Sequence, residues 1–343
     1  MSDAPAHTSS GIVTPRARTG ARQRDRLITL AGIAAIAAAA ALGYFAFQTD
    51  LAFLTRLVAT ALFVMSLDLV MGYCGIATLG HAALFGAGAY AAGIAAVHGF
   101  TGPFAMLAIG MGGGAIAGLI SGFIILRATG LTQLVLSIAV VELASAFANK
   151  ASSSTGGSDG LSGISPAPLF GRFEFDLFGV TAYWLSVGAL LVTFVVLRVV
   201  VTSPFGLLCR GIREDRLRVA AMGSRIRPAL LAMYILSGIV AGLAGGLAAV
   251  ATGVVGLDSL SFERSASALV MLVLGGTGTL FGGLIGTLVF ETVQSIVSAA
   301  NPFHWLTLIG LMLIAVVLFM PRGLQGLVAG LASLRRGSRE PTP

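Results

Sequence analysis

Long apolar runs of a length suited to membrane helices alternate with short polar stretches along almost the whole chain. Runs of roughly 17 to 25 apolar residues span the core of a bilayer as helices, because a helix satisfies its own backbone polar groups. The alternation of apolar and polar residues that is typical of β-barrel strands is absent. The pattern therefore predicts an all-α fold, a polytopic membrane bundle of about 8–10 transmembrane helices.

About ten such runs are predicted as spans. In chain order they cover residues 27–47, 51–72, 79–98, 103–126, 131–149, 181–201, 228–252, 262–274, 281–300 and 304–320. The run at 262–274 is short and leads into Gly275-Gly276-Thr277-Gly278. Because transporters tolerate interrupted helices that are buried in protein or face water, this run is also compatible with a broken or re-entrant helix.

Composition and charge agree with a membrane protein. Hydrophobic residues make up 56% of the chain and charged residues only 10%, whereas soluble proteins contain about 25% charged residues. The net charge of +7 would also suit a nucleic-acid binder. The arginines, however, fall mainly in the loops and tails that a cytoplasmic N-terminus places on one side, as the positive-inside rule describes. We therefore expect both termini in the cytoplasm and no nucleic-acid partner.

The same pattern divides the chain into a membrane domain and two tails. Residues 1–26 are basic and poor in large apolar residues, which predicts a disordered cytoplasmic tail. Residues 27–327 form the transmembrane domain, with an external loop at 151–180, and residues 328–343 form a basic cytoplasmic tail. A secretory signal peptide is the alternative for the first apolar run, but that run is about 20 residues long and lacks a small-residue cleavage site.

Residues 203–227 form a dense charged segment between two apolar blocks. Its ionisable side chains are Arg210, Arg213, Glu214, Asp215, Arg216, Arg218, Arg225 and Arg227. Because charged side chains are unfavourable in lipid, this segment must lie in water, on the cytoplasmic side. We predict a docking surface, with a solvated loop that only follows the charge bias as the alternative.

Chemistry typical of a nucleotide-hydrolysing or metal enzyme is missing from the sequence. The only lysine is Lys150, so a phosphate-binding loop of the form G-x-x-x-x-G-K-[ST] does not occur. The histidines are too dispersed for a zinc motif. Cys74 and Cys209 fall on the predicted cytoplasmic side, where disulfides are rare. We expect no catalytic, cofactor or metal site in this chain.

Three carboxylates lie inside predicted spans, where a charge costs about 3 kcal/mol or more and is a functional candidate. They are Asp68, Glu142 and Glu291. Glu142 and Glu291 each share a helical face with further polar residues. These side chains should face protein or water, either in a substrate path or in helix packing. Arg56, near the end of a span, is expected to extend to the membrane surface.

A glycine-rich segment at residues 72–90 allows a helix to bend or neighbouring helices to approach closely. Gly80 and His81 are therefore candidates for a substrate path or for helix packing. His81 could bind solute, take up a proton or form a hydrogen bond to the backbone. The structural role is favoured, because no acidic residue is near it in sequence.

The same segment carries a resemblance to a known family. Its pattern, G-Y-x-G-x-x-x-L-G-H-A-A-x-F-G-x-G-A-Y, is similar to the signature stretch of the permease subunits of branched-chain amino acid ABC transporters. Five further motifs follow in the family's order, at residues 155–164, 203–206, 213–215, 273–278 and 321–324. The likeness extends over residues 51–327, and the long external loop suggests the LivM-like type.

The resemblance implies a division of labour. The chain would be a permease subunit in a bacterial inner membrane, with residues 27–327 as the permease domain. It would pair with a second homologous permease, and two cytoplasmic ABC ATPase subunits would bind ATP and magnesium. An extracytoplasmic solute-binding protein would deliver the solute. This arrangement would explain why no phosphate-binding loop is present.

The charged segment of this chain resembles the part of such permeases that couples the ATPase to the membrane gates. Relative to the pattern R-E-[ND]-E-x-A-A-x-A-x-G, this chain keeps Arg213, Glu214, Asp215, Ala221 and Gly223. It has Arg216, Arg218 and Val219 where glutamate and two alanines are usual, which changes the shape and charge of the docking face.

Alternatives remain for the external loop and for the solute. Gly156, Gly157, Ser158 and Asp159 are expected either to contact the binding protein or to form a rigid turn cluster. The resemblance implies branched-chain or related amino acids, with urea, amides or another small solute as the alternative. From other classes, a proton-coupled secondary transporter that uses the three carboxylates as a relay, or a passive channel, stays open.

Overall fold

The computed structural model describes residues 15–46, 50–175 and 179–300, together with residues 307, 310 and 314. Within these residues the chain is almost entirely helical, and strand-like pairing is limited to two isolated bridges, Leu161 with Val255 and Leu169 with Phe173. The predicted all-α membrane bundle is thus confirmed. The tail at 328–343 and nearly all of the last predicted span, 304–320, lie outside the described residues.

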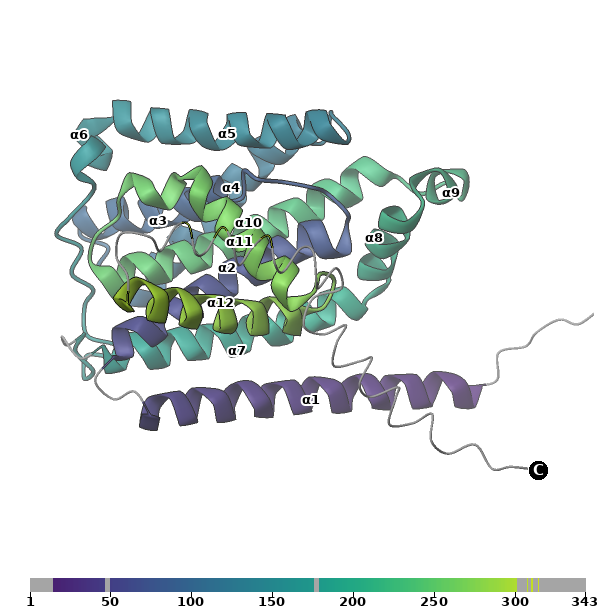
Figure 1. Cartoon of the computed structure of the whole chain (residues 1–343), viewed down its shortest axis with the longest axis horizontal. Helices are drawn as coiled ribbons and strands as arrows, with labels where there is room; N and C mark the ends of the chain where they lie inside the picture. The colour runs from purple at the N-terminus through teal and green to yellow at the C-terminus, as the bar shows by residue number, and fades with distance from the viewer. Residues whose placement is uncertain are drawn as a thin grey trace, which may run out of the picture.

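The long helices lie side by side, with their axes roughly parallel in Figure 1. In chain order the elements are α1 (Pro15–Ala46), α2 (Leu51–Asp68), the π-helical turn η1 (Leu69–Tyr73), α3 (Ala82–Val97), α4 (Pro103–Ile125), α5 (Leu131–Lys150), α6 (Ser152–Thr155), η2 (Gly157–Asp159), α7 (Val180–Thr202), α8 (Pro204–Glu214), α9 (Arg216–Ala221), α10 (Ile226–Thr252), η3 (Leu257–Leu260), α11 (Phe262–Gly275) and α12 (Leu280–Ala300). Helix α1 begins at Pro15, so residues 15–26, which we predicted to be disordered, are helical.

Seven helices among the described residues are long and apolar enough to cross a membrane: α1, α2 with η1, α4, α5, α7, α10 and α12. Helices α3 and α11 have 16 and 14 residues. At 1.5 Å per residue they are about 24 and 21 Å long, shorter than the roughly 30 Å hydrocarbon core. The helix predicted at 79–98 is therefore shorter than expected, since it covers only Ala82–Val97, and the prediction of a short helix at 262–274 is confirmed.

Both short helices follow a long helix and an irregular segment. The chain leaves η1 and runs through residues 74–81 before α3 begins, and it leaves α10 and runs through residues 253–261 before α11 begins. The two short helices meet at their first turns, where the backbone N–H of Ala82 donates a hydrogen bond to Ser265 Oγ at 2.8 Å. The bundle thus contains two interrupted helices whose N-terminal ends are in contact.

Helix α10 lies at the centre of the bundle and packs against α2, α3 and α4. Glycine makes the closest of these contacts possible. A Cβ atom on Gly242 of α10 would overlap the carbonyl of Gly110 and come within 2.9 Å of Gly114 Cα, both on α4. Small residues allow helix backbones to approach in this way, and membrane proteins use them because lipid supplies no hydrophobic force between helices.

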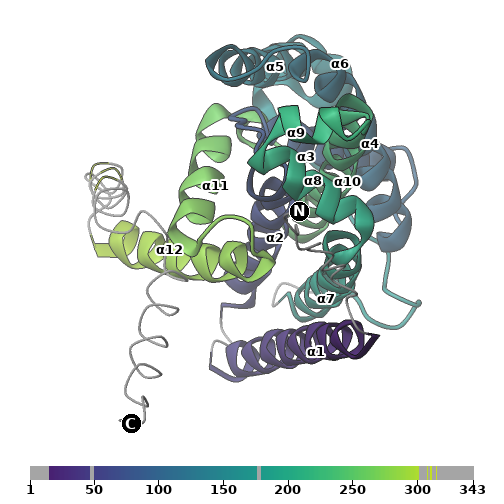
Figure 2. The ribbon, with the colours of Figure 1, turned by 90° about the vertical axis from the view of Figure 1, so that its right-hand side faces the viewer.

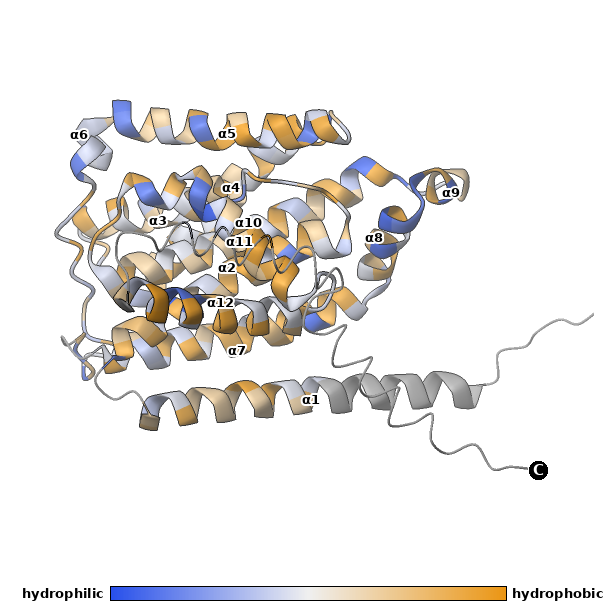
Figure 3. Cartoon of the chain, viewed as in Figure 1, coloured by the Kyte–Doolittle hydropathy of each residue, from blue (hydrophilic) through white to orange (hydrophobic). Residues whose placement is uncertain are grey.

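The two ends of the bundle differ in character. Helices α8 and α9 lie at one end, which we call the arginine-rich end, and α6 and the start of α2 lie at the other, which we call the loop end (Figure 1). Hydrophilic residues are prominent on α8 and at the start of α10, whereas apolar residues dominate the long helices between the ends (Figure 3). This distribution fits a bundle whose middle lies in lipid.

Candidate functional site

Helices α8 and α9 form a short projection at the arginine-rich end, in front of the bundle in Figure 2. Ser203 begins α8: its Oγ accepts a hydrogen bond from the backbone N–H of Gly206 at 3.3 Å, and Pro204 lies in the first turn. The helix is amphipathic, because Cys209 and Ile212 are buried while its arginines are exposed. Its apolar face holds the projection against the bundle.

The five residues predicted to couple the chain to an ATPase lie together on this projection. They are Arg213, Glu214, Asp215, Ala221 and Gly223, and all but Asp215 are exposed. Asp215 begins α9, and its Oδ1 accepts a hydrogen bond from the backbone N–H of Arg218 at 3.0 Å. Gly223 has a φ of 80°, in the left-handed region that favours glycine, and follows the end of α9. Their coupling role stays a prediction.

A polar cluster joins the projection to the helices behind it. We call it the Asp68–Arg213 cluster, and it consists of Asp68, Gly72, Arg213 and Gly278. Arg213 Nη1 donates a hydrogen bond to the Gly72 carbonyl, and Asp68 Oδ1 accepts one from the backbone N–H of Gly278 at 2.7 Å. A Cβ atom on Gly72 would overlap the Asp68 carboxylate. The cluster therefore ties α8 to the end of α2 and to the turn between α11 and α12.

His81 lies deeper in the bundle and is fully buried. Its Nε2 is 2.9 Å from Ser66 Oγ and 3.2 Å from Ser237 Oγ, and its ring stacks on Phe63 with centroids 5.5 Å apart. Ser237 Oγ also donates a hydrogen bond to the Ser66 carbonyl at 2.6 Å. These contacts join α2, α10 and the start of α3, which agrees with the structural role favoured for this histidine.

Gly80 allows the first turns of α5 to approach the segment that precedes α3. A Cβ atom on Gly80 would overlap the Ser137 carbonyl, and the backbone N–H of Leu79 donates a hydrogen bond to Ser137 Oγ at 2.9 Å. Gly80 is thus a point of close backbone contact between α5 and this segment. Glu142, further along α5, is exposed, and α5 lies at the periphery of the bundle in both views (Figures 1 and 2).

The four loop residues predicted to contact a binding protein form a compact turn at the loop end. Gly156 and Gly157 have φ of 77° and 60°, while Ser158 and Asp159 are exposed. The following Leu161 exchanges backbone hydrogen bonds with Val255, at 2.8 and 2.9 Å. The loop is therefore a turn cluster attached to the linker between α10 and α11, with two polar side chains facing outward.

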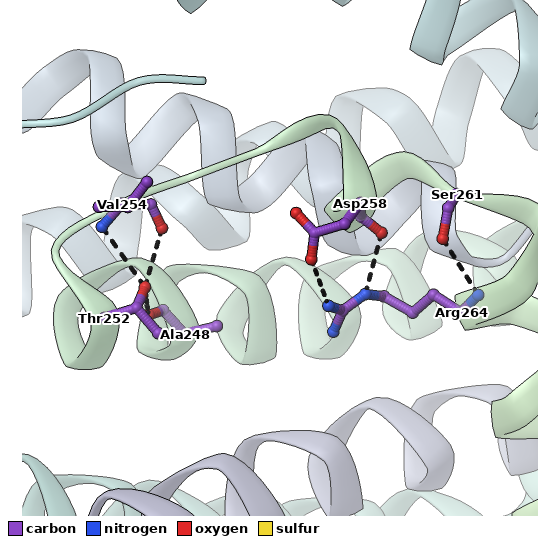
Figure 4. A network of polar contacts seen from close by, with 6 residues as sticks. All are labelled: Ala248, Thr252, Val254, Asp258, Ser261 and Arg264. Atoms are coloured by element: carbon purple, nitrogen blue, oxygen red, sulfur yellow. Dashed lines mark hydrogen bonds and ion pairs between the residues drawn. The ribbon is translucent and has the colours of Figure 1, made fainter. Parts of the chain in front are cut away.

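A charged cavity of about 270 Å³ lies near the loop end, between α2, α11 and α12. Glu291, one of the predicted candidates, lies in its wall and is only 8% exposed. Arg56 Nη2 lies 4.0 Å from Glu291 Oε2. Across the cavity, Arg264 Nη2 donates to Asp258 Oδ2 at 3.0 Å, and Arg264 Nε donates to the Asp258 carbonyl at 3.2 Å (Figure 4).

Residues 49–317 match a protein family described as "Branched-chain amino acid transport system / permease component". The chain belongs to this family. Among curated proteins, this permease is 25% identical over 296 residues to the high-affinity branched-chain amino acid transport system permease protein LivM of Escherichia coli strain K12, covering 80% of this chain and 69% of that one. The protein of the same description in Salmonella typhimurium is 25% identical over 295 residues, with the same coverage. No solved structure matches the permease.

The family confirms the resemblance derived from the motifs. Together with the seven apolar helices of the described residues, it identifies the chain as a multi-pass membrane protein and a transport component. Permeases of this family belong to systems of several components, so partner proteins are implied in general. Among the described residues, no group of three or more His, Cys, Asp or Glu side chains is arranged so that it could hold a metal ion.

Sequence reasoning missed several partners that the permease brings together. Arg56 was expected only to reach the membrane surface, yet it lies beside Glu291. Asp258 and Arg264 were assigned no role, although both line the charged cavity. Gly278 was known as part of a glycine-rich motif, and its backbone N–H turns out to bind Asp68. The sequence signal that could have pointed to these cavity residues is that they are charged and lie near the ends of predicted spans.

Proposed function

We propose that this chain is the membrane-spanning permease subunit of an ABC importer for branched-chain or related amino acids, and that partner subunits hydrolyse the ATP. The observation that carries the proposal is the Asp68–Arg213 cluster. A residue of the exposed projection is hydrogen-bonded to η1, which continues α2, and the last residue of α2 is in turn bonded to the turn before α12. A protein that moved the projection would therefore move the ends of membrane helices.

The surface of the projection suits a docked protein. Leu217 is 84% exposed and Met222 is 78% exposed, although both lie beside charged residues at the end of the bundle. Exposed apolar patches that are surrounded by polar residues are typical of interaction surfaces. Arginine side chains around them would favour an acidic partner surface and guide its approach. We assign this surface to a cytoplasmic ATPase subunit.

Energy must come from outside the chain in this scheme. A phosphate-binding loop needs a lysine after its glycines, and the only lysine is Lys150 at the end of α5. ATP and magnesium would therefore bind to the ATPase subunits. A second permease would cover the exposed Glu142 on α5, because a carboxylate in the middle of a span is unfavourable in lipid.

The external side of the scheme rests on the turn cluster at the loop end. Ser158 and Asp159 would contact a solute-binding protein, and the strand-like pairing of Leu161 with Val255 would connect that contact to the linker before α11. Branched-chain amino acids are proposed as solutes because both curated relatives are described as branched-chain amino acid permeases. Urea or amides are the alternative within the same family.

The structure gives less support to a proton relay than to an ATP-driven importer. Asp68 is bonded to Gly278 at the arginine-rich end, Glu142 is exposed on α5, and Glu291 pairs with Arg56 near the loop end. A relay needs neighbouring groups that exchange a proton along hydrogen bonds, and these carboxylates lie in three separate surroundings. An uncoupler should therefore not stop solute uptake as long as the ATP concentration is held constant.

The test is affinity purification of the tagged chain from gently solubilised membranes, followed by identification of the co-purifying proteins. We expect an ABC ATPase subunit with the native chain, and its loss with the double variant Leu217→Glu, Met222→Glu. Phe170→Glu is the matched control, because Phe170 is 79% exposed but lies at the loop end. Equal recovery of the ATPase with all three chains, or its absence with the native chain, would contradict the proposal.

A further inference from the structure

Two adjoining cavities near the loop end differ sharply in chemistry. The charged cavity described above shares Arg56, Thr60 and Arg264 with a second cavity of about 500 Å³. We call the second one the apolar cavity, because Phe53, Ala59, Phe85, Ala182, Ala248 and Ala251 are among its lining residues. Binding sites for small molecules have this character: several hundred Å³, mostly apolar walls and a few polar groups that fix orientation.

The two arginines that line both cavities differ in how firmly neighbouring residues hold their side chains. Arg264 is held in place, because Asp258 accepts its hydrogen bonds at 3.0 and 3.2 Å and its guanidinium lies 4.8 Å from the ring centre of Phe85. Arg56 is held more loosely: its guanidinium lies 5.5 Å from the ring centre of Phe53, its side chain is 64% exposed, and the Glu291 carboxylate is 4.0 Å away. An arginine can form five hydrogen bonds, so most donors of Arg56 are available to a ligand.

Glu291 is the opposite charge in this arrangement. Its side chain is 11% exposed and faces the same cavity as Arg56. A buried carboxylate is costly unless it is well paired, and the Thr60 hydroxyl together with a cation at the outer limit of an ion pair compensates Glu291 only in part. A ligand that offered an ammonium group to Glu291 and a carboxylate to Arg56 would pair both side chains at short distances.

We propose that these cavities bind the zwitterionic backbone and the aliphatic side chain of an α-amino acid on its way through the membrane. Arg56 binds the α-carboxylate, Glu291 accepts hydrogen bonds from the α-ammonium group, and the apolar cavity takes the side chain. This inference rests on the proposed function for its solute class and adds the place and the groups that recognise it. Arg264 acts as a positioning residue that keeps Asp258 and Phe85 in the walls.

The geometry also favours an amino acid over a neutral amide or urea. A neutral solute would enter without separating the Arg56–Glu291 pair and would leave Glu291 with no closer cation than before. An α-amino acid has no net charge, so the site stays electrically balanced on binding while each charged group gains a hydrogen-bonded partner. The aliphatic part of the ligand gains from the apolar walls by burial.

The test measures ligand binding to the chain together with the subunits that co-purify with it, in lipid nanodiscs, by saturation-transfer difference NMR. The probes are L-leucine, 4-methylpentanoate, which lacks the amine, and 3-methylbutylamine, which lacks the carboxylate. We expect L-leucine to bind at least tenfold more tightly than either analogue, because each analogue leaves either Arg56 or Glu291 without its partner. Arg56→Gln and Glu291→Gln should each weaken L-leucine binding about tenfold or more.

Arg172→Gln is the matched control, because Arg172 is an exposed arginine of the external loop and does not line either cavity. It should bind L-leucine as the native chain does. Equal binding of leucine and its analogues, absence of leucine binding, or unchanged leucine binding in Arg56→Gln and Glu291→Gln would each overturn the inference. Monodisperse elution and unchanged subunit recovery show that the variants are folded.

Parallel uptake measurements separate this inference from the proposed function. If the full system imports leucine with ATP while the cavity variants transport as well as the native chain, the cavity assignment is wrong and the importer assignment stands. If leucine binds with the expected dependence on Arg56 and Glu291 but uptake does not need ATP, the importer assignment is wrong and the cavity assignment stands.

Discussion

Arg213 offers a direct test of how force would pass from the α8–α9 projection to the membrane helices. Its guanidinium donates a hydrogen bond to the Gly72 carbonyl near the end of η1. A Cβ atom on Gly278, whose backbone N–H binds Asp68, would come within 2.9 Å of the same guanidinium. Replacing Arg213 by alanine removes the bond between α8 and η1 and leaves the rest of the cluster in place. The perturbation therefore removes one polar link between the projection and η1, while the buried face of α8 keeps the projection against the bundle.

The size of the effect follows from the surroundings of the bond. A hydrogen bond from a charged donor contributes roughly 1.5–3 kcal/mol, and solvent screening lowers this for a side chain that is exposed, as Arg213 is, to about 1 kcal/mol. A bias of about 1 kcal/mol changes an equilibrium roughly fivefold. We expect the amount of solute imported per ATP hydrolysed to fall by about two- to fivefold.

The assay compares leucine uptake with ATP hydrolysis in vesicles that contain the whole transporter. Arg213→Lys keeps the charge but loses the forked donor geometry, so it should recover only part of the coupling. Arg225→Ala is the matched control, because Arg225 is exposed in the same segment and lies outside the Asp68–Arg213 cluster. An unchanged ratio of uptake to hydrolysis in Arg213→Ala, with ATPase recovery also unchanged, would refute the reasoning.

Two further predictions concern the stability of the bundle, measured as the unfolding midpoint of the purified chain in detergent. Gly242→Val places a branched side chain against the α4 backbone and should cost roughly 1–3 kcal/mol or more, whereas Gly112→Ala, whose Cβ would meet open space, should change little. An equal loss in both would mean that the α4–α10 contact is looser than described. Ser237→Ala removes a hydroxyl from His81 and the hydrogen bond to the Ser66 carbonyl, at a cost of about 1–2 kcal/mol. A midpoint equal to that of the native chain would argue against a buried network there.

Much of the architecture was available from the sequence, and the reason is the bilayer. Lipid cannot hydrogen-bond the backbone, so an apolar run of sufficient length must be a helix, and hydropathy alone placed α2, α4, α5, α7 and α10. The charged segment at 203–227 was also predictable, because eight ionisable side chains cannot lie in lipid. The ordered motifs gave the family, which the family match over residues 49–317 confirms.

Hydropathy was less informative where a helix is interrupted. Residues 79–98 are apolar throughout much of their length, yet α3 begins only at Ala82, after an irregular segment that other parts of the chain stabilise. Leu79 bonds to Ser137 and Ala82 bonds to Ser265, so polar partners from α5 and α11 satisfy backbone groups that a continuous helix would have satisfied itself. A window of local sequence contains neither partner.

Tertiary structure alone decided which charged and polar groups meet. Asp68 binds a backbone N–H that is 210 residues away, and Arg213 binds a carbonyl that is 141 residues away. The sequence determined that Arg56 and Glu291 needed water or a partner, because the bilayer penalises an isolated charge wherever it occurs along the chain. Which partner each found depended on how α2, α11 and α12 pack, and that packing is set by side-chain shape and close helix contacts far apart in sequence.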